Sequence, residues 1–341
     1  MHAPNVHVGG GRQLLRGLLR ALEARGGYAA ILDERFDAGF ELARATNVIR
    51  VRPRITQRLA AEFRLKGLAR AGSTVLCFAN LPPLFRLHAR VYLFLQNRYL
   101  CSDASLAGFP ASARMQLTVE RRWMRWRAAN VDVILVQTAS VQREVERHVN
   151  RPARVLPFLP DRALVDADSR RRPGDPDSMR FLYVASGEPH KNHRRLIEAW
   201  RTLAEAGLRP SLLLTIDPDR HNQLAVEVDT FTKRHGLKIR NLGVLPPSEL
   251  TRWYGEADAL IYPSFMESFG LPLLESSAAG LPIIAAERDY VRDVVNPVET
   301  FDPDSPLSVA RAVRRFMGRA DPPQQPLSAE AFVQRLLEPD A

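Results

Sequence analysis

Short apolar runs alternate with longer segments of helical periodicity along the whole chain. This alternation predicts parallel strands that are joined by crossover helices. In the first half, the pattern predicts strands at Pro4–Val8, Tyr28–Leu32, Asn47–Val51, Thr74–Asn80, Val91–Leu95, Val131–Val136 and Arg154–Leu156. Helices are expected in the same half at Arg12–Arg25, Ile55–Ala71, Ser112–Ala129 and Ser140–Val149.

The pattern is interrupted at residues 160–178, where charged residues, Pro and Gly replace the periodic apolar positions. Beyond it, strands are expected near Arg180–Ala185, Ser211–Ile216, Ile239–Leu242, Ala259–Tyr262 and Pro282–Ala286. The helices between them are expected near Asn192–Ala206, Asn222–His235, Pro247–Tyr254 and Leu271–Ala279. A helix near Ser305–Met317 precedes a proline-rich turn and a last helix near Ala329–Leu337, which we expect to return to the first domain.

These elements predict an α/β protein of two Rossmann-like, doubly wound domains. A length of 341 residues also favours two domains over one. We assign residues 1–160 to the first domain, 161–178 to a linker, 179–320 to the second domain and 321–341 to a tail helix. Two such domains that face each other place a ligand in a central cleft, at the C-terminal ends of their strands.

The composition indicates the compartment in which the protein works. Apolar residues make up 45% of the chain, and no apolar stretch approaches the roughly 18 residues that span a bilayer. The N-terminus lacks the apolar block of a signal peptide. Two cysteines without metal-ligand spacing favour a reducing compartment over a disulfide framework. We therefore expect a cytoplasmic protein.

The strongest chemical signal is a loop between a strand and a helix near residue 270. Glu267 lies in the loop, and the helix begins close to Gly270, which allows a ligand to approach the backbone. The free N–H groups of residues 268–271 form an anion site at the positive end of the helix dipole. Glu275 lies eight residues beyond Glu267, at most about 12 Å away along a helical rise. This spacing suits two hydroxyl-bearing parts of one ligand with a phosphate group between them.

The run ESFGLPLLE, within PSFMESFGLPLLESSAAGLPIIA, resembles the Glu-x7-Glu motif of the retaining family 4 glycosyltransferases. The resemblance implies the GT-B fold, with the nucleotide-sugar donor bound by the second domain and the acceptor by the first. By this resemblance, Glu267 is catalytic and contacts hydroxyl groups of the donor sugar, and Glu275 contacts the ribose. The donor-binding residues that this motif implies are Glu267, Ser268, Phe269, Gly270, Leu271 and Glu275.

A second segment, FLYVASGEPHKNHRRLIEAW, resembles the family's loop between the first strand and first helix of the C-terminal domain. Lys191 matches the lysine that neutralises the donor diphosphate, and the resemblance makes it a second catalytic residue. The family also carries an arginine directly after this strand, where the present chain has Val184 and Ala185. That contact is either missing or made by Arg194 or Arg195, and we place Arg195 among the donor-binding residues.

Three further matches concern the base and the first domain. Backbone groups around Gly243 and Val244 would contact the nucleotide base, which leaves the identity of the base open. Gly10 and Gly11 resemble the family's glycine loop, which faces the donor phosphate and the acceptor, although glycines there also permit a tight turn. Asn97 stands at a strand end where many relatives carry a histidine near the reacting centre. It is therefore a candidate catalytic residue, and a turn-capping asparagine is the alternative.

Four Asp-x-Asp pairs could suggest the metal site of a different class of glycosyltransferase. Proline in the middle of three of them favours turns instead. We expect no metal and no cofactor apart from the donor. The pairs are Asp166/Asp168, Asp175/Asp177, Asp217/Asp219 and Asp302/Asp304.

The net charge of +10 is unevenly distributed. Residues 1–160 hold 25 Lys and Arg against 11 Asp and Glu, which gives +14, and residues 161–341 hold 23 against 27, which gives −4. A basic half indicates an anionic partner, such as a membrane surface, a nucleic acid or a phosphorylated acceptor. A high genomic GC content would enrich arginine in the same way without any partner.

Two basic stretches account for much of this excess. Residues 50–70 carry seven cations and one glutamate, and residues 120–127 mix tryptophan with arginine, which suits an anionic interface. Buried stripes with a snorkelling basic rim would give the same composition. We expect an anionic membrane surface and a glycan or lipid-linked acceptor as partners. We do not expect a nucleic acid, because the best ligand motif lies in the acidic half.

Together these observations predict a retaining hexosyltransferase that moves a sugar from a nucleoside diphosphate sugar to an acceptor hydroxyl. The resemblance implies a role in lipopolysaccharide, O-antigen or exopolysaccharide synthesis, by a peripheral protein on the inner face of the cytoplasmic membrane. Lys191 and the helix amides would stabilise the departing diphosphate. The alternatives are a GT-B type sugar-nucleotide epimerase or hydrolase and, from another class, a basic protein that binds nucleic acid or membrane.

Overall fold

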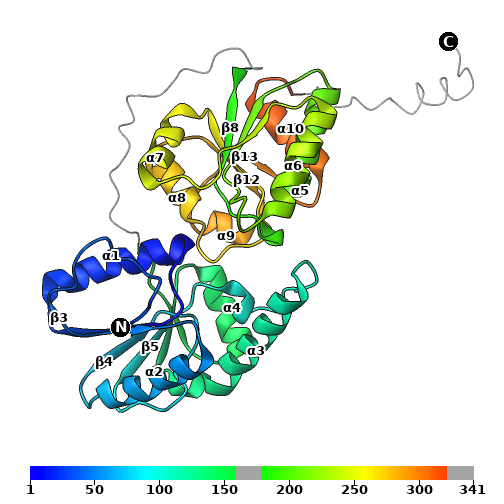
Figure 1. Ribbon diagram of the computed structural model, residues 1–341. Coiled ribbons are helices and arrows are strands. Elements are labelled where there is room, and N and C mark those ends of the chain that lie inside the picture. The colour runs from blue at the N-terminus through cyan, green and yellow to red at the C-terminus, as the bar shows by residue number, and fades with distance from the viewer. Residues whose placement is uncertain (159–177, 321–341) are drawn as a thin grey trace, which may run out of the picture.

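The computed structural model describes residues 1–158 and 178–320, which form two α/β domains (Figure 1). The first domain is built on a seven-stranded sheet in the order β3-β2-β1-β4-β5-β6-β7. Its strands are β1 His2–Ala3, β2 Tyr28–Asp33, β3 Ala45–Val51, β4 Thr74–Cys77, β5 Arg90–Phe94, β6 Val133–Val136 and β7 Ala153–Val155. Its helices are α1 Gly9–Arg25, α2 Ile55–Leu68, α3 Ala111–Arg127 and α4 Ala139–Val149, with the 3₁₀ turns η1 Arg98–Leu100 and η2 Ala128–Asn130.

The second domain has a six-stranded sheet in the order β10-β9-β8-β11-β12-β13. Its strands are β8 Arg180–Tyr183, β9 Ser211–Leu214, β10 Ile239–Asn241, β11 Ala259–Tyr262, β12 Ile283–Ala286 and β13 Glu299–Phe301. Its helices are α5 His193–Glu205, α6 Asn222–His235, α7 Pro247–Glu256, α8 Leu271–Ala278, α9 Asp289–Arg292 and α10 Pro306–Phe316, with the 3₁₀ turn η5 Pro189–Lys191. The paired strands run parallel in both sheets.

The side-chain alternation of β2 shows how the first sheet separates two cores. Ala30 and Leu32 pack in the apolar cluster that contains α1, whereas Ile31 packs in the cluster that contains α2. Successive residues of a strand face opposite sides of a sheet, so an apolar run buries both faces. In Figure 1, α1 and α2 accordingly lie on opposite sides of this sheet. The second domain is built around one large cluster that includes the buried Trp200.

The two parallel sheets confirm the predicted pair of doubly wound domains. One correction concerns the first strand, which is His2–Ala3 and not Pro4–Val8. It pairs with Ile31 and Leu32 of β2, and the chain turns directly afterwards at Pro4, which has no N–H to give to the sheet. As a second correction, the glycines at 9–11 are the first residues of α1 and not a loop.

Smaller differences concern element ends. The strand predicted at Thr74–Asn80 ends at Cys77, and β13 and α9 were not expected because both are short and partly polar. The linker at 161–178 and the tail at 321–341, with its helix, fall almost entirely outside the described residues. Cys77 and Cys101 are free thiols buried in the first domain. Within the described ranges, no helix is long and apolar enough to cross a membrane.

Candidate functional site

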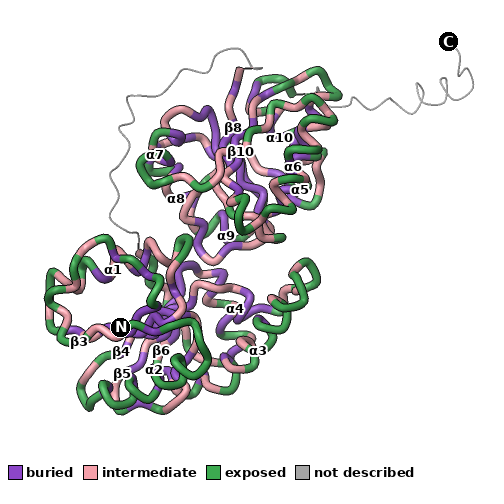
Figure 2. The backbone as a smooth tube through the Cα atoms, in the orientation of Figure 1, coloured by how far each residue is buried: buried purple, intermediate pink, exposed green. Residues whose placement is uncertain are grey.

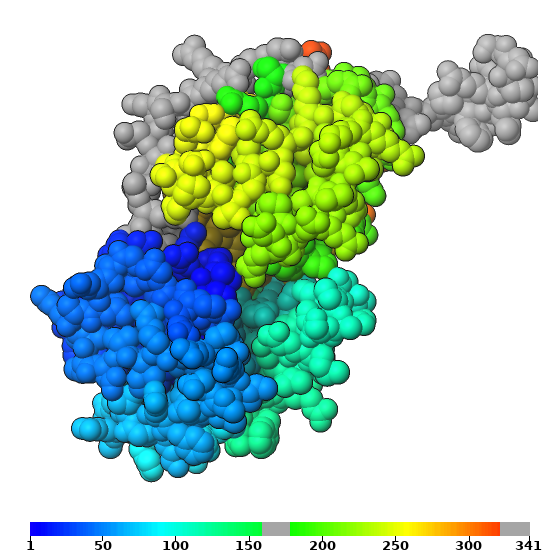
Figure 3. Space-filling view, in the orientation of Figure 1, coloured from blue at the N-terminus to red at the C-terminus, as the bar shows by residue number. Residues whose placement is uncertain are grey.

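A cleft of about 580 Å³ lies between the two domains, which meet at a waist in Figure 3. The first domain contributes residues 8–14 at the start of α1, together with Gln96 and Gln137, to its wall. The second domain contributes the loops that follow β8, β9, β10 and β11 and the first turns of α8. These loops all leave the C-terminal ends of parallel strands, which is where doubly wound sheets bind ligands.

The start of α8 forms one end of the cleft. Gly270 adopts a left-handed conformation with φ of 72°, and a Cβ atom there would approach a side-chain carbon of Leu273 to 2.9 Å. Glycine is therefore required by both the backbone and the packing. Pro272 lies in the first turn, where a missing N–H costs nothing. Four successive residues at this helix start border the cleft, namely Ser268, Phe269, Gly270 and Leu271.

Glu267 is buried next to this helix, and Lys191 provides its charge partner. The Lys191 ammonium donates to both carboxylate oxygens, at 2.7 and 2.8 Å, and the Tyr262 hydroxyl donates to Oε1 at 3.0 Å. Burial, the largest single effect, would raise the pKa of Glu267, but the positive charge of Lys191 together with side-chain hydrogen bonds from Lys191 and Ser264 holds this pKa below its usual value. Glu267 is therefore ionised in the cleft.

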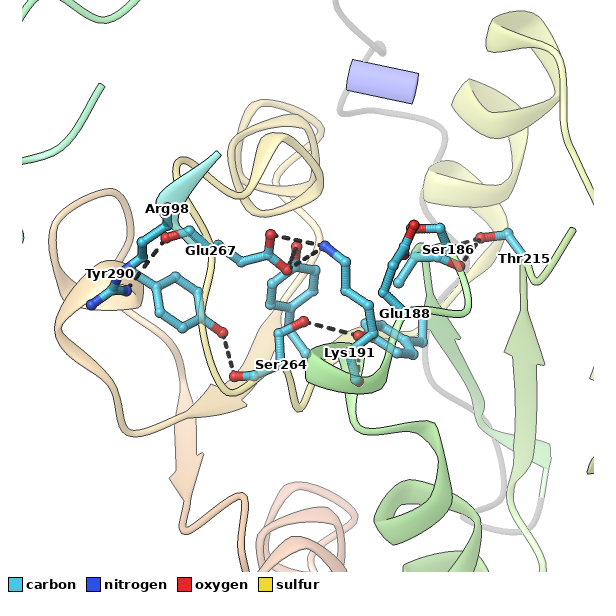
Figure 4. Close-up of polar contacts among 11 residues, drawn as sticks. Arg98, Ser186, Glu188, Lys191, Thr215, Ser264, Glu267 and Tyr290 are labelled. Atoms are coloured by element: carbon cyan, nitrogen blue, oxygen red, sulfur yellow. Dashed lines mark hydrogen bonds and ion pairs between the residues drawn. The ribbon is translucent and has the colours of Figure 1, made fainter. Parts of the chain in front are cut away.

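The backbone around Lys191 is fixed from two sides (Figure 4). The Tyr183 hydroxyl donates to the Lys191 carbonyl at 2.7 Å and lies 2.9 Å from the Ser264 hydroxyl. Asn192, with φ of 63°, donates its side-chain amide to the carbonyls of Pro263 and Pro303. These bonds tie the loop that carries Lys191 to the loop that carries Glu267.

Two histidines flank Lys191 and are neutral. Burial first, and the positive charge of Lys191 second, lower the pKa of His190 to about 4 and that of His193 to about 3. The His193 ring packs against Tyr183 with ring centroids 4.9 Å apart. Neither histidine borders the cleft.

The residues predicted to contact the ribose and the base lie in the second turn of α8 and in the loop after β10. Glu275 borders the cleft and accepts a hydrogen bond of 2.8 Å from the Tyr254 hydroxyl. Val244 borders it as well and is 69% exposed. Gly243 lies just behind Val244 and donates its backbone N–H to the Asn241 side chain at 3.3 Å. The loop after β10 therefore forms part of the cleft wall.

The glycines at the start of α1 allow the domains to approach closely. A Cβ atom on Gly10 would lie 3.0 Å from a side-chain carbon of Leu271, across the domain boundary. A Cβ atom on Gly11 would lie 3.1 Å from Oε1 of Gln96. Both glycines border the cleft, and a larger residue at position 10 would crowd Leu271 at the start of α8.

The structure does not bring two predicted residues into the cleft. The Asn97 side chain accepts from the Tyr99 backbone N–H at 3.1 Å and caps η1, and Gln96 faces the cleft instead. Arg195 donates to the Asp304 carbonyl at 3.1 Å and lies over the Phe265 ring. Which side chain borders the cleft depends on the exact residue at which a strand ends. A pattern of apolar residues locates that residue only to within one or two positions.

Two arginines that sequence analysis missed do border the cleft. Arg12 follows the glycines of α1, and Arg220 lies in the turn after β9. This turn packs against the loop after β8, which lacks the arginine that the family resemblance leads us to expect. The contact is close, since a Cβ atom on Gly187 of that loop would clash with the His221 ring. In the described part of the chain, no residue pairs with the Arg220 guanidinium. The sequence signal that could have identified Arg220 is its position as a cation in the segment that follows a parallel strand.

The Asp-x-Asp pairs that are described form turns. The Asp217 carboxylate accepts from the backbone N–H of Asp219, and Asp302 accepts from that of Asp304, both at 3.0 Å. The pairs at 166/168 and 175/177 lie outside the described residues. Residues 1–158 and 178–320 contain no group of three or more His, Cys, Asp or Glu side chains that could hold a metal ion.

The second domain is similar in sequence to a described family of proteins. Residues 166–328 match the model of the family "Glycosyl transferases group 1". O-antigen chain mannosyltransferase B of Escherichia coli is 34% identical over 115 residues, which are 33% of this chain and 30% of the relative. The chain therefore matches less than a third of that relative's length.

Solved structures match nearly the whole chain at low identity. Anabaena HepE in complex with UDP-glucose has a TM-score of 0.64 and 13% identity, covering 99% of this chain and 97% of HepE. WaaG, a glycosyltransferase involved in lipopolysaccharide biosynthesis, has a TM-score of 0.61 and 16% identity, covering 91% and 87%. These likenesses confirm the predicted GT-B fold of two facing domains.

Proposed function

We propose that this chain, whose residues 166–328 match the model of the glycosyl transferases group 1 family, transfers a hexosyl group from a nucleoside diphosphate sugar to an acceptor hydroxyl. The observation that carries the proposal is the meeting of Lys191, ionised Glu267 and the N-terminal residues of α8 in one cleft. A cation and helix amides suit a diphosphate, and a carboxylate suits sugar hydroxyls. The UDP-glucose complex of HepE supports a nucleotide sugar as donor.

The donor would extend along α8. The diphosphate would lie on the amides of Phe269, Gly270 and Leu271, with Lys191 redirected from Glu267 toward it. Glu275, whose carboxylate is held in place by the Tyr254 hydroxyl, would accept hydrogen bonds from the ribose. The base would lie against the loop that contains Val244. We propose Arg220, in place of Arg195, as the second cation near the diphosphate.

The chemistry would depend on stabilising the leaving group. As the bond to the sugar breaks, negative charge grows on the diphosphate, and preorganised cations and amides stabilise this charge. Glu267 would orient the sugar once its carboxylate is released by Lys191. We propose transfer with retention of configuration, in line with the Glu-x7-Glu resemblance, and without a divalent metal, because Lys191 and α8 provide the positive charge.

The acceptor would be a lipid-linked or surface-polysaccharide precursor bound by the first domain. The similarity to an O-antigen mannosyltransferase and to WaaG supports a role in lipopolysaccharide, O-antigen or exopolysaccharide synthesis. Such an acceptor is presented at a membrane. A peripheral location on the inner face of the cytoplasmic membrane follows as part of the proposal.

The first domain has a surface that suits this location. Ile55, Leu59 and Phe63 form a ridge along α2 that is 81, 41 and 62% exposed, and Figure 2 shows much of this helix as exposed. The exposed cations on and beside α2 are Arg52, Arg54, Arg58, Arg64, Lys66 and Arg70, whereas its one acid, Glu62, is buried. Apolar side chains with surrounding cations favour an anionic bilayer.

The tryptophans of α3 differ in their exposure. Trp126 is 68% exposed, with Arg127 over its ring, and can join the α2 ridge in contacting lipid. Trp123 is half-buried and donates its indole N–H to the Pro82 carbonyl at 3.0 Å. Its contribution is therefore to the packing of α3, which leaves Trp126 as the candidate lipid contact of the two.

Incubation of the protein with labelled UDP-, GDP-, dTDP- and ADP-sugars, with and without a bacterial lipid extract, tests the proposed function. We expect one donor to release nucleoside diphosphate and to label the lipid fraction, in EDTA as well as in buffer. Product without any acceptor would indicate an epimerase or a hydrolase. Activity that is lost in EDTA and restored by Mn²⁺ would contradict the metal-free mechanism. Salt-sensitive binding of nucleic acid without turnover would contradict the enzyme proposal.

A further inference from the structure

Arg98 of the first domain reaches the loop that carries Glu267 in the second domain (Figure 4). It lies in η1, shortly after β5, and its side chain is 17% exposed. Its guanidinium Nη1 donates to the backbone carbonyl of Glu267 at 3.4 Å. The residue whose carboxylate pairs with Lys191 is thus also held at its backbone from the opposite domain.

A carboxylate in its own domain fixes the orientation of Arg98. Nε donates to Oε2 of Glu144 at 2.8 Å, and Nη2 donates to the other oxygen. A bidentate pair of this kind sets the plane of the guanidinium, and burial makes that geometry costly to change. The pair with Glu144 consequently holds the guanidinium in the orientation in which Nη1 points at the Glu267 carbonyl.

Glu144 lies on α4, which is itself attached to the second domain. The N–H of Ser140, in the first turn of α4, donates to the Asp293 carboxylate at 2.9 Å, and Arg143 lies 3.6 Å from Asp289. Asp289 and Asp293 belong to or directly follow α9. A continuous series of hydrogen bonds and ion pairs therefore runs along the domain boundary. It leads from α9 to α4, from Glu144 on α4 to Arg98, and from Arg98 to the backbone of Glu267.

The far side of the same loop is held from inside the second domain. Tyr290 donates to the Ser264 carbonyl at 2.7 Å, and Tyr183 contacts the Ser264 hydroxyl. These bonds fix the beginning of the loop, three residues before Glu267. Arg98 acts at Glu267 itself, where a small shift of the backbone would move the carboxylate relative to Lys191.

We propose that Arg98 is a positioning residue through which closure of the two domains sets the Glu267 loop for catalysis. In the closed arrangement the Nη1 contact holds the Glu267 carbonyl, and separation of the domains breaks it. The full constraint on Glu267 then exists only while the acceptor domain faces the donor. The proposal rests on the function proposed above, and Arg98 itself touches neither substrate in this account.

Two variants separate positioning from folding. Arg98→Lys keeps a charge, but an ammonium cannot bind both Glu144 oxygens and reach the carbonyl with the same geometry. Arg98→Leu combined with Glu144→Leu removes the buried ion pair as a unit, a change that proteins often tolerate. Arg125→Ala is the matched control, because it removes an arginine of the first domain that pairs with Asp103 and lies outside the contacts that lead to Glu267.

The first measurement is amide hydrogen exchange of residues 263–270 in the ligand-free protein. We expect exchange at this loop to quicken by about fivefold in both Arg98 variants, the size of effect that the loss of one hydrogen bond produces, with the β5 and α4 peptides unchanged. The Arg125→Ala control should match the wild type. Unchanged exchange at 263–270, or faster exchange throughout β5 and α4, would overturn the positioning role.

The second measurement is steady-state transfer with whichever nucleotide sugar the donor screen identifies. We expect kcat to fall by about 10- to 100-fold in the double variant while the donor KM stays within about threefold, because a positioning loss acts in the transition state. A large rise in KM with unchanged kcat would overturn the proposal. If the wild type uses no nucleotide sugar, the proposed function fails, and the exchange measurement still decides whether Arg98 holds the loop.

Discussion

The ammonium of Lys191 donates to both carboxylate oxygens of Glu267, at 2.7 and 2.8 Å, although 76 residues separate the two in the chain. The family resemblance assigns them to different parts of the donor, the diphosphate and the sugar. In the ligand-free cleft they neutralise each other. The ion pair keeps both groups charged and oriented in the absence of a ligand. Under the proposed function, donor binding would replace this one buried pair by two new contacts, one to each group.

Replacement of Glu267 by glutamine should lower turnover by at least about 100-fold, because a charged hydrogen bond at the reacting sugar is worth about 2–3 kcal/mol. The shape of the side chain is kept, so the loss reports on charge. Steady-state kinetics of the purified variant measures it. Glu256→Gln, on the exposed side of α7, is the control. Wild-type kcat in Glu267→Gln would remove this residue from the proposed catalytic site.

Replacement of Glu275 by glutamine should mainly raise the KM for the donor, by about tenfold, because the amide cannot accept ribose hydrogen bonds with the strength of a carboxylate. Tyr254→Phe should give a smaller rise, since it removes the hydroxyl that holds Glu275. Donor titrations at saturating acceptor distinguish KM from kcat. A fall in kcat alone would contradict the assignment of Glu275 to the ribose.

The buried histidines should make the protein less stable in mild acid. The folded-state pKa of His193 is about 3, whereas the unfolded side chain takes up its proton near pH 6.5. The unfolded state therefore binds more protons between these values, and stability is lost as the pH falls below about 6.5. Each such histidine should lower the free energy of unfolding by about 2 kcal/mol between pH 7 and pH 5.

Urea unfolding of His193→Phe at the two pH values tests this effect. The phenyl ring keeps the packing on Tyr183, so the variant should lose less stability in acid than the wild type does. The exposed His88 provides the matched control, His88→Gln. An identical pH dependence in wild type and His193→Phe would show that His193 does not contribute.

The α2 ridge should bind anionic vesicles and release them in salt. Flotation with vesicles containing phosphatidylglycerol, compared with pure phosphatidylcholine, measures the preference. Binding should weaken as salt shortens the Debye length from about 10 Å at 0.1 M to about 3 Å at 1 M. Ile55→Ser with Phe63→Ser should reduce binding, whereas Val298→Ser, at an exposed apolar position of the second domain, should not. Equal binding to both vesicles would contradict an electrostatic contact.

Sequence patterns predicted most of the fold because apolar periodicity reports local burial. Buried strands such as Ala259–Tyr262 are apolar at every position and are easily recognised. The two-residue strand His2–Ala3 is too short to carry a pattern, and only its pairing with β2 defines it. The Glu267 loop was recognisable because its residues are contiguous in the chain.

Local sequence patterns could not predict contacts between segments that are far apart in the chain. Arg98 and Glu267 are 169 residues apart, and their contact depends on how the two domains meet. Arg220 reaches the cleft because the turn after β9 packs on the loop after β8, which no local pattern encodes. Asn97 and Gln96 differ by one position along a strand end, and that step decides which side chain faces the cleft.

The central claim is that Lys191 and the start of α8 hold the diphosphate of a nucleotide sugar. Calorimetric titration of the purified protein with UDP, GDP, dTDP and ADP tests it most directly, with wild type, Lys191→Ala and Arg194→Ala side by side. Arg194 is the control because it pairs with Glu227 outside the cleft. We predict that one nucleoside diphosphate binds wild type and Arg194→Ala equally and binds Lys191→Ala at least about tenfold more weakly. Equal affinity in all three proteins, or no binding of any of the four nucleotides, would contradict the account.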